Sequence, residues 1–560
     1  MIASVKVGAP GRTRASGAIT TGGLAGVADG LYNVRVSKKP SPPPAVAAPL
    51  SAGFRRFLYF TSAMTGAITL IVEILGAKML APYFGTSHFV WTAQIGVTLI
   101  SLAVGYWFGG WLVDRDQRPG QLYACLVGAA VYLGLVVLLC EPVAFACLKA
   151  GKLAFGSVLA SAFLFLVPLT LLAATGPFVI RLLTPSVNQV GGQVGRLYAV
   201  STVGSVAGTV LIGYALLPFF PNSVTMLGTA GVLIGLAAAY WIGWGQGRGA
   251  VAPLLAALAV TGLVGGTGVA RDLNWRHPGM ELLYRANSDF GLLQVVRNKR
   301  DGHLYYLNDY LTQNTYDPVA KQSVSLFTYM LHGLAVAYTE RLDRVLCIGL
   351  GVGIAPMQLA RGGAQVDAVE INPAVVPLAQ AHFDLEPDKL NLHIGDGRAF
   401  LRQTDQRYDA VVLDAFLGDS SPSHLMTREA FQAIQDVLQP EGVLVINSFG
   451  DLERGKDFFA ASLHKTLAAV FASVKIHATG NGNVFFVASA RPELSFRRSP
   501  VLAGAHPLVR YSVERAYDTT VQTSIESGVV LTDDFNPVEF HDAANREDMR
   551  RRLALGMKPH

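Results

Sequence analysis

Glycines and acidic residues in the second half of the chain are spaced as a nucleoside-binding site would require. The segment Val345–Gly353, VLCIGLGVG, is an apolar run that leads into Gly349, Gly351 and Gly353. Such glycines allow a tight turn and let backbone N–H groups approach a ligand at a helix N-terminus. A plain strand-to-helix turn has the same pattern, so the residues that follow must decide between the two.

Three acidic residues follow this segment, each at the end of an apolar run. Glu370, 17 residues after Gly353, is placed to accept both hydroxyls of a ribose. Asp396, in GDGR, is placed to accept from an adenine amino group, while Gly397 lets the base lie close. Asp414, in VVLDAF, would face the ligand, because ligands bind outside the carboxyl ends of parallel strands. Each residue also has a structural alternative: Glu370 could be a solvated carboxylate, Asp396 part of an Asp-Gly turn, and Asp414 a helix N-cap.

A parallel sheet is needed to bring these residues together. Five strands with helices between them are expected, at Arg344–Gly349, Gln365–Glu370, Leu390–Ile394, Ala410–Asp414 and Gly442–Ser448. This alternation predicts a sheet with helices on both faces, which a later pair, Val474–Ala478 and Asn483–Ala488, would finish antiparallel. Upstream, residues 280–313 read as several strands, followed by a helical stretch near 318–338.

The composition predicts that much of the chain lies in lipid. Hydrophobic residues make up 51% of its 560 residues and charged residues only 15%, whereas a soluble domain has about a quarter charged. A bilayer core of about 30 Å needs roughly 20 helical residues. Seven apolar runs reach that length, at 57–81, 89–113, 121–140, 156–180, 198–220, 223–244 and 250–270. The net charge of +6 does not imply nucleic acid, because basic loops beside membrane helices give the same sign.

Together these patterns predict a multi-pass α-helical membrane domain followed by a Rossmann-like α/β domain of the class I methyltransferase type, with a small β-hairpin region before it. The expected segments are a disordered tail (1–52), a transmembrane domain of about seven helices (53–270), a β-rich substrate-side subdomain (271–340), an adenosyl-cofactor domain (341–490) and a C-terminal extension (491–560). The four cysteines show no metal-ligand spacing, so neither a metal site nor a disulfide framework is expected.

The glycine loop and the three acidic residues, in this order, resemble the spermidine synthase family, within the wider class of adenosylmethionine-dependent methyltransferases. The resemblance covers about residues 280–490. Upstream, LNDYLTQ, with Asp309 and Gln313, is similar to the LDGxxQ segment of that family. EILGAKMLAPYFG, at Glu73–Gly85, and LTDDFNPVE, at Leu531–Glu539, look typical of a membrane-bound bacterial subgroup of aminopropyltransferase-like proteins.

The resemblance implies an activity: transfer of the aminopropyl group of decarboxylated S-adenosylmethionine, a co-substrate rather than a permanently bound cofactor, to putrescine. The products would be spermidine and methylthioadenosine. A carboxylate near the attacking nitrogen can take its proton. The resemblance assigns the cofactor loop to Gly349, Gly351 and Gly353, ribose to Glu370, adenine to Asp396 and Gly397, proton acceptance to Asp414, and the amine side to Asp309, Gln313, Asp419 and Pro422. It also implies a polyamine substrate and a homodimer.

The departures from the family pattern fall on the amine side. Val352 stands where the glycine loop of the family usually carries an Asp, and Leu417 stands where a second Asp would follow the first by three residues. Leu326-Phe327 replaces a Tyr-His pair, and Gly291 replaces a Gln. Two alternatives therefore stay open: a membrane-bound methyltransferase that uses S-adenosylmethionine, and a transporter with a non-catalytic polyamine- or nucleoside-sensing domain. Asp414 argues against the sensor, which needs no base.

Basic residues predict the orientation in the membrane. They precede or follow the apolar runs on one side, at Arg35, Lys38, Lys39, Arg55, Arg56, Arg115, Arg118, Arg181 and Arg196, which places the N-terminus in the cytoplasm. Seven spans would then place the C-terminal domain outside, although an adenosyl co-substrate is made in the cytosol. We therefore expect the cell (inner) membrane, a cytoplasmic catalytic domain, and either an even number of spans or a re-entrant segment near Pro142–Lys152 or 261–268.

Overall fold

A computed structural model of the chain describes most of its residues from Leu50 onward. The described ranges are 50–85, 88–150, 152–184, 190–245, 251–274, 277–416, 422–453, 455–478, 482–500, 504–522 and 525–541. Residues 1–49, which make up most of the tail predicted to be disordered, lie outside these ranges, and so does Asp419.

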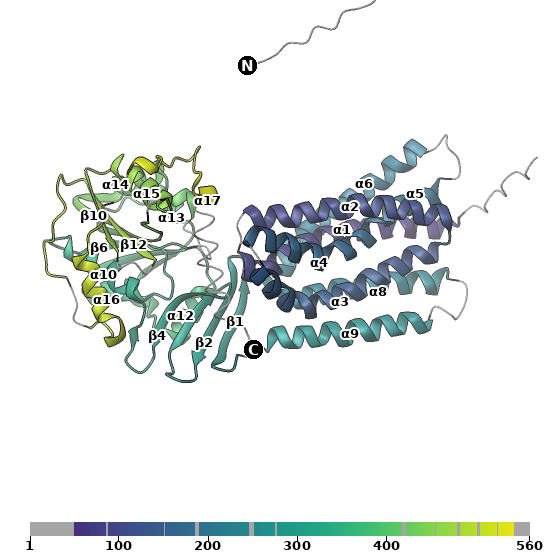
Figure 1. The fold of residues 1–560 in the computed structure, drawn as a ribbon, viewed down its shortest axis with the longest axis horizontal. Helices are drawn as coiled ribbons and strands as arrows, with labels where there is room; N and C mark the ends of the chain where they lie inside the picture. The colour runs from purple at the N-terminus through teal and green to yellow at the C-terminus, as the bar shows by residue number, and fades with distance from the viewer. Residues whose placement is uncertain are drawn as a thin grey trace, which may run out of the picture. The chain divides into compact units, whose positions relative to one another are not determined.

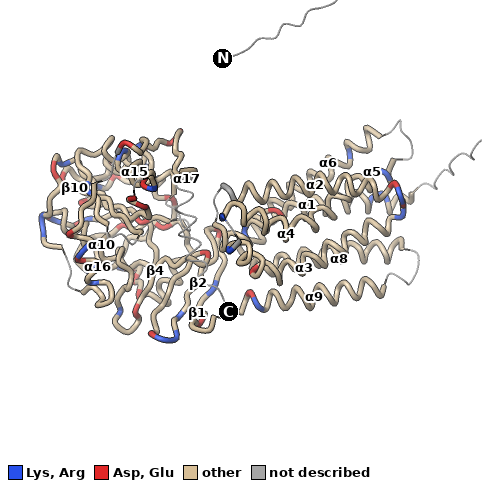
Figure 2. The backbone as a smooth tube through the Cα atoms, viewed as in Figure 1, with Lys and Arg blue, Asp and Glu red and all other residues tan. Residues whose placement is uncertain are grey.

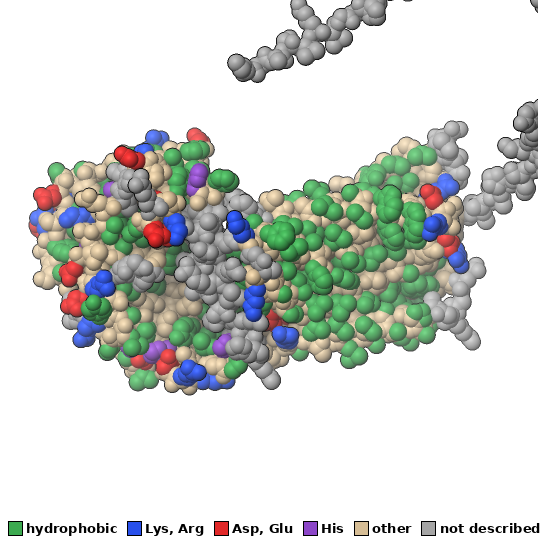
Figure 3. All heavy atoms as spheres, in the orientation of Figure 1, with side chains coloured by type: hydrophobic (Ala, Val, Ile, Leu, Met, Phe, Trp, Pro, Cys, Tyr) green, Lys and Arg blue, Asp and Glu red, His purple; other side chains and the backbone are tan. Residues whose placement is uncertain are grey.

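The first part of the described chain is a bundle of apolar helices (Figure 1). Seven of its described helical segments are long and apolar enough to cross a membrane. The helices are α1 (Ala52–Phe84), α2 (His88–Arg115), α3 (Pro119–Ala150), α4 (Leu153–Ala173) with α5 (Thr175–Leu183), α6 (Val190–Leu211) continued by Ile212–Leu216 and α7 (Leu217–Phe219), α8 (Asn222–Gly243) and α9 (Val251–Leu273). Hydrophobic side chains cover most of the visible face of this bundle (Figure 3).

Small residues let two of these helices approach closely. A Cβ on Gly204 of α6 would lie 2.1 Å from the carbonyl oxygen of Ala63 on α1, and a Cβ on Gly208 would lie 2.5 Å from that of Ala67. Contacts this short exclude any side chain at the two glycines. The GSVAG segment thus serves helix packing, as small residues four apart commonly do in membranes.

The two places where a re-entrant segment was expected are both helical. Pro142 lies inside α3, which continues to Ala150, and residues 261–268 lie within α9. A proline is tolerated there because neighbouring helices and local adjustments satisfy the freed carbonyl. Among the described residues the count of candidate spans is therefore seven, and the expected even number is not found.

The second part of the chain contains a seven-stranded sheet of order β11-β12-β10-β9-β6-β7-β8. The strands are β6 (Arg344–Ile348), β7 (Gln365–Glu370), β8 (Asn391–Ile394), β9 (Tyr408–Leu413), β10 (Leu438–Phe449), β11 (Ser473–Ala478) and β12 (Asn483–Ser489). Strand β12 runs antiparallel to both of its neighbours, whereas β10, β9, β6, β7 and β8 are parallel. The strands predicted from the sequence, including the antiparallel end, are present.

Helices cover both faces of this sheet. They are α10 (Leu326–Ala337), α11 (Ile354–Arg361), α12 (Val375–His382), α13 (Gly397–Gln403), α14 (Arg428–Val437) and α15 (Phe458–Ala468). Successive residues of β6 belong to different cores: Val345 and Cys347 to one, Leu346 and Ile348 to the other. Because side chains alternate along a strand, the continuous apolar run of β6 is explained by burial on both faces.

A smaller antiparallel sheet precedes the α/β domain and packs against the helical bundle. It consists of β1 (Met280–Ser288), β2 (Gly291–Asn298), β3 (Leu304–Asn308), β4 (Leu311–Asp317) and β5 (Gln322–Ser323), paired in chain order. Leu292, Val296, Leu307 and Tyr310 share a hydrophobic core with residues of the apolar helices. Arg285 adds an ion pair, since its Nη2 lies 2.7 Å from Oδ1 of Asp272 at the end of α9.

The C-terminal extension folds back over the α/β domain. Helix α16 (Pro507–Asp518) packs on α10, and the hydroxyl of Tyr517 donates to the carbonyl of Tyr329. His506, which precedes α16, lies near His303 and Asp317, with its Nε2 3.3 Å from Oδ2 of Asp317. Its Nδ1 accepts the N–H of Leu508, which leaves the ring proton on Nε2. The hydrogen bond between His506 and Asp317 therefore ties the extension to the hairpin sheet.

The helix count and the basic residues together predict which side of the membrane carries the α/β domain. Arg55 and Arg56 lie near the start of α1, Arg115 ends α2 and Arg181 lies in the last turn of α5. Lys and Arg residues gather at the end of the bundle near α5, away from β1 (Figure 2). Short basic loops stay in the cytoplasm. If all seven candidate helices cross, the α/β domain would lie on the other face, whereas the place where the co-substrate is made predicts a cytoplasmic domain.

Reporter fusions after residue 541 test this orientation. We expect alkaline phosphatase fused there to be active and green fluorescent protein fused there to be dark, because the first functions outside the cytoplasm and the second fluoresces inside it. Fusions in the loop after Arg115 serve as the matched control and should give the reverse pattern. A fluorescent C-terminal fusion would instead support a cytoplasmic domain and would require one apolar helix not to cross.

Candidate active site

A cavity of about 810 Å³ opens at the carboxyl ends of β6, β7 and β9. Most of the residues predicted from the sequence line it, namely Gly349, Gly351, Glu370, Asp396, Gly397, Asp414, Gln313 and Pro422. Its volume is in the range of small-molecule sites. Gly353 and Asp309 do not line it, and Asp419 lies outside the described residues.

The glycine loop owes its shape to backbone conformations and contacts that exclude side chains. Gly349, Gly351 and Gly353 have φ of 95°, 53° and 82°, in the region that favours glycine. A Cβ on Gly349 would lie 2.2 Å from the carbonyl oxygen of Asp414. A Cβ on Gly353, which precedes α11, would lie 2.5 Å from Cδ1 of Leu385. Gly353 therefore shapes the turn before α11, although it does not line the cavity.

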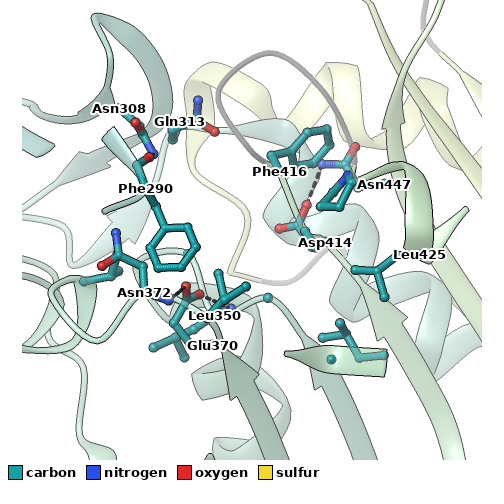
Figure 4. Close-up of a pocket in the computed structure, with 18 of the residues that line it drawn as sticks. Phe290, Asn308, Gln313, Leu350, Glu370, Asn372, Asp414, Phe416, Leu425 and Asn447 are labelled. Carbon is teal, nitrogen blue, oxygen red and sulfur yellow. Dashed lines mark hydrogen bonds between the residues drawn. The ribbon is translucent and has the colours of Figure 1, made fainter. Parts of the chain in front are cut away.

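Glu370 fixes this loop from the end of β7. Its Oε2 accepts the N–H of Leu350 at 3.0 Å, and its Oε1 accepts the N–H of Asn372 at 2.8 Å (Figure 4). Burial raises the pKa of the Glu370 carboxyl, and the backbone N–H groups oppose that rise. The N–H groups of Gly351 and Ile371 also contribute to this effect, so the surrounding backbone holds the carboxylate in place at the cavity wall.

Asp396 lies in the cavity wall with both of its oxygens engaged. Oδ1 accepts the N–H of Ala399 and caps α13, while Oδ2 lies 2.9 Å from Nε2 of His424. Burial raises the pKa of Asp396, but hydrogen bonds to Ala399 and His424 outweigh it and leave the pKa below its usual value. The residue is thus a helix cap that also faces the cavity. Gly397 is required beside it, since a Cβ there would lie 2.4 Å from Cγ2 of Ile348.

Asp414 follows β9 and receives one strong hydrogen bond. Its Oδ1 accepts from Nδ2 of Asn447 at 2.8 Å, and Oδ1 of Asn447 accepts from Nδ2 of Asn483 at 3.0 Å (Figure 4). The second bond fixes the orientation of the Asn447 amide. The pKa of Asp414 is raised to about 6, because burial raises it by more than the hydrogen bond from Asn447 lowers it. A carboxylate with that pKa is ionised at neutral pH and is a stronger base than an exposed one.

The remaining wall is built from amides and aromatic rings. Phe290, Asn308 and Gln313 come from the hairpin sheet, and Phe416 and Leu425 come from the segments after β9 (Figure 4). Apart from Gln313, sequence reasoning did not single out these residues, and it did not single out Asn447 or His424. Asn447 could have been predicted, because it is a polar residue in the apolar segment VINSF near the end of β10, the strand next to β9.

Asp309 lies apart from this cavity. Its φ is 48°, and its Oδ1 accepts the N–H of Leu292 at 2.9 Å, which closes the turn between β3 and β4 against β2. It lines a second cavity of about 380 Å³ together with Lys78 and Asp272. The structure therefore separates Asp309 from Gln313, although the two were predicted to act on the same substrate.

An ion pair from the C-terminal extension holds the segment around His424. Nη1 and Nη2 of Arg398 each lie 2.6 Å from an oxygen of Asp533, and Nη1 also donates to the carbonyl of His424. The hydroxyl of Thr427 donates to Asp533 at 2.8 Å. Asp533 belongs to the LTDDFNPVE segment, so this segment contributes to the site through Arg398.

The sheet order, the antiparallel β12 and the glycine loop beside Glu370 define a Rossmann-like fold of the class I methyltransferase type. Comparison with known proteins narrows this class. A family model described as the spermine/spermidine synthase domain matches residues 325–480.

Curated relatives agree with this match. The chain is 30% identical over 223 residues to a polyamine aminopropyltransferase of Vibrio vulnificus, covering 38% of this chain and 74% of that protein. It is 28% identical over 219 residues to an N-terminal histidine N-methyltransferase of Emericella nidulans, covering 35% of this chain and 38% of that protein. A spermidine synthase structure from Thermotoga maritima aligns with a TM-score of 0.33 and 17% identity, over 42% of this chain and 87% of that one. The chain belongs to the family of the spermidine synthases and polyamine aminopropyltransferases.

Replacing Asp533 tests whether the extension supports the site. Asp533→Asn removes the charge that pairs with Arg398, whose side chain is only 10% exposed, whereas that of Asp533 is 42% exposed. We expect a loss of about 1–2 kcal/mol in unfolding free energy, between the values for exposed and buried pairs. Binding of methylthioadenosine should weaken as well, because the segment around His424 loosens. Asp534→Asn, next in sequence, is the control. Equal effects of the two variants in thermal unfolding and calorimetry would contradict a specific role for Asp533.

Proposed function

We propose that the α/β domain transfers the aminopropyl group of decarboxylated S-adenosylmethionine to an amine. The first acceptor to test is putrescine, which would give spermidine and methylthioadenosine. The observation that carries the proposal is the position of Asp414, a carboxylate of raised pKa that lines the cavity beside the glycine loop, in a chain of this family.

The donor would bind along the glycine loop. Gly349 and Gly351 line the cavity in the loop that leads into α11, and Glu370 would contact the ribose hydroxyls from the end of β7. Asp396 and Gly397 lie where an adenine ring would stack against the wall. The cavity of about 810 Å³ is large enough for a nucleoside with its sulfonium substituent and a small amine. We assign no metal ion to this reaction.

The transfer is a displacement at carbon. The lone pair of a neutral amine attacks the aminopropyl carbon next to sulfur, a C–N bond forms, the C–S bond breaks and methylthioadenosine leaves with the electron pair. The proton released from the amine passes to Asp414. Asn447 keeps the Asp414 oxygen aligned through its hydrogen bond and acts as a positioning residue. Gln313 and Pro422 would border the amine.

Methyl transfer from S-adenosylmethionine is the second candidate. Val352, which lines the cavity within the glycine loop and is buried, offers no charge to the ammonium of an aminopropyl group. One of the relatives bears a methyltransferase name. The two reactions differ in their sulfur product, because methyl transfer releases adenosylhomocysteine.

The assay follows from this difference. The full-length protein, purified in detergent, is incubated with putrescine and either the decarboxylated or the intact sulfonium donor. We expect methylthioadenosine from the decarboxylated donor alone. Adenosylhomocysteine from the intact donor would support methyl transfer instead, and the absence of both products with a range of amines would favour a sensing domain.

Asp414→Asn should lower kcat by about two to four orders of magnitude, the usual contribution of a positioned base. The change removes proton acceptance but keeps the size of the side chain. The control is Asp409→Asn on the same strand, where the carboxylate accepts backbone N–H groups of Asp343 and Arg344 far from the cavity. A full rate for Asp414→Asn would remove the proposed base.

The pH dependence tests the role of Asn447. Because Asp414 must be ionised and its pKa is about 6, kcat should fall as the pH drops through that value. The Asn447 bond lowers this pKa, so Asn447→Leu should raise it and move the acid limb of the profile to higher pH. A variant that loses rate equally at every pH would show a structural role only.

A further inference from the structure

The wall of the Asp414 cavity includes the ends of three apolar helices. Phe84 is the last residue of α1, Val90 lies in the first turn of α2, and Leu153 and Ala154 begin α4. These helices are among those long and apolar enough to cross a membrane. The cavity therefore extends from the glycine loop to the level at which these helices would leave the bilayer.

Exposed apolar surface begins directly beside this wall. Trp91, next to Val90, is 37% exposed, and Phe155, next to Ala154, is 60% exposed. One turn further along, Ile95 of α2 and Leu159 of α4 are also exposed. Tryptophan at a helix end is typical of the membrane interface. On both α2 and α4, therefore, the residue that follows the cavity wall in sequence already belongs to the exposed apolar surface.

The charges of the cavity suit one amine better than two. Its described lining holds three carboxylates, of which Glu370 is bonded to the backbone and Asp396 to α13 and His424. Among the lining residues that the structure describes, Asp414 is the carboxylate that remains for the amine side. Aromatic rings form much of the surrounding wall, at Phe290, Phe327, Phe416, Phe449 and Phe540.

A free diamine would have to place its second ammonium in these surroundings. Burying a charge without a charged partner is unfavourable, and contact with ring faces offsets only part of that cost. An acceptor with a single amine and an apolar remainder avoids the cost, provided that the remainder stays in the bilayer beside α2 and α4.

We propose that the acceptor is a primary amine carried by a membrane amphiphile, which reaches Asp414 past the ends of α1, α2 and α4. This inference rests on the proposed aminopropyl transfer and specifies its acceptor. The amine nitrogen forms a C–N bond with the aminopropyl carbon, the C–S bond breaks, methylthioadenosine leaves and the amine proton passes to Asp414. The lipid product carries a secondary amine and a new primary amine.

The test uses the full-length protein in vesicles with the decarboxylated donor. One preparation contains phosphatidylethanolamine mixed with phosphatidylcholine, a second contains phosphatidylcholine alone, and a third adds putrescine to the second. We expect methylthioadenosine mainly in the first, together with phosphatidylethanolamine that has gained one aminopropyl group by mass spectrometry. Release with putrescine and no lipid product would overturn the lipid acceptor but leave aminopropyl transfer standing. No release in any preparation would overturn both.

A variant of the helix-end wall adds a second measurement. Ala154→Trp fills the wall on the side of α4, and Val158→Trp is the matched control, because Val158 lies one turn further along the same helix, is 43% exposed and is not part of the lining. We expect Ala154→Trp to lower the rate with phosphatidylethanolamine at least tenfold while methylthioadenosine still binds, and Val158→Trp to leave the rate unchanged. Equal rates for both variants, with the fold verified by circular dichroism, would overturn the proposed route.

Discussion

The close approach of β6 and β9 at their carboxyl ends is the constraint on which the rest of the site depends. The loop after β6 passes so near the carbonyl of Asp414 that only glycine fits at position 349. Glu370 holds the same loop from the next strand by accepting the N–H of Leu350. The glycine loop and Asp414 therefore share one rigid edge of the sheet, where the geometry is set largely by backbone contacts.

Around this edge, segments distant in sequence complete the cavity. The C-terminal extension reaches it through Asp533, which fixes Arg398 and thereby the carbonyl of His424, and through Phe540 in the wall. The hairpin sheet supplies Asn308 and Gln313 from the opposite side. The hairpin sheet packs on the core of the apolar helices and on one core of the α/β domain, whereas the segment around Asp533 packs on the other core of that domain, so the cavity depends on the correct assembly of all three.

Electrostatics assigns different tasks to the three carboxylates of the described lining. Backbone N–H groups hold Glu370 and Asp396, and these bonds oppose the rise in pKa that burial causes at both carboxyls. Asp414 has one amide partner and a pKa raised by burial, which suits a group that takes a proton. Helix ends, with Phe84 and Ala154, supply an apolar boundary that a free diamine would not require.

The sequence alone determined the features that local patterns encode. Period-two and continuous apolar runs predicted the strands, and glycine spacing predicted the loop, because both depend on the conformations of neighbouring residues. The seven apolar runs predicted the helices, since length and hydropathy suffice. Only the tertiary structure separated Asp309 from Gln313, brought Asn447 to Asp414 and placed the ends of α1, α2 and α4 in the cavity wall. These relations depend on packing between segments far apart in the chain, which residue spacing does not specify.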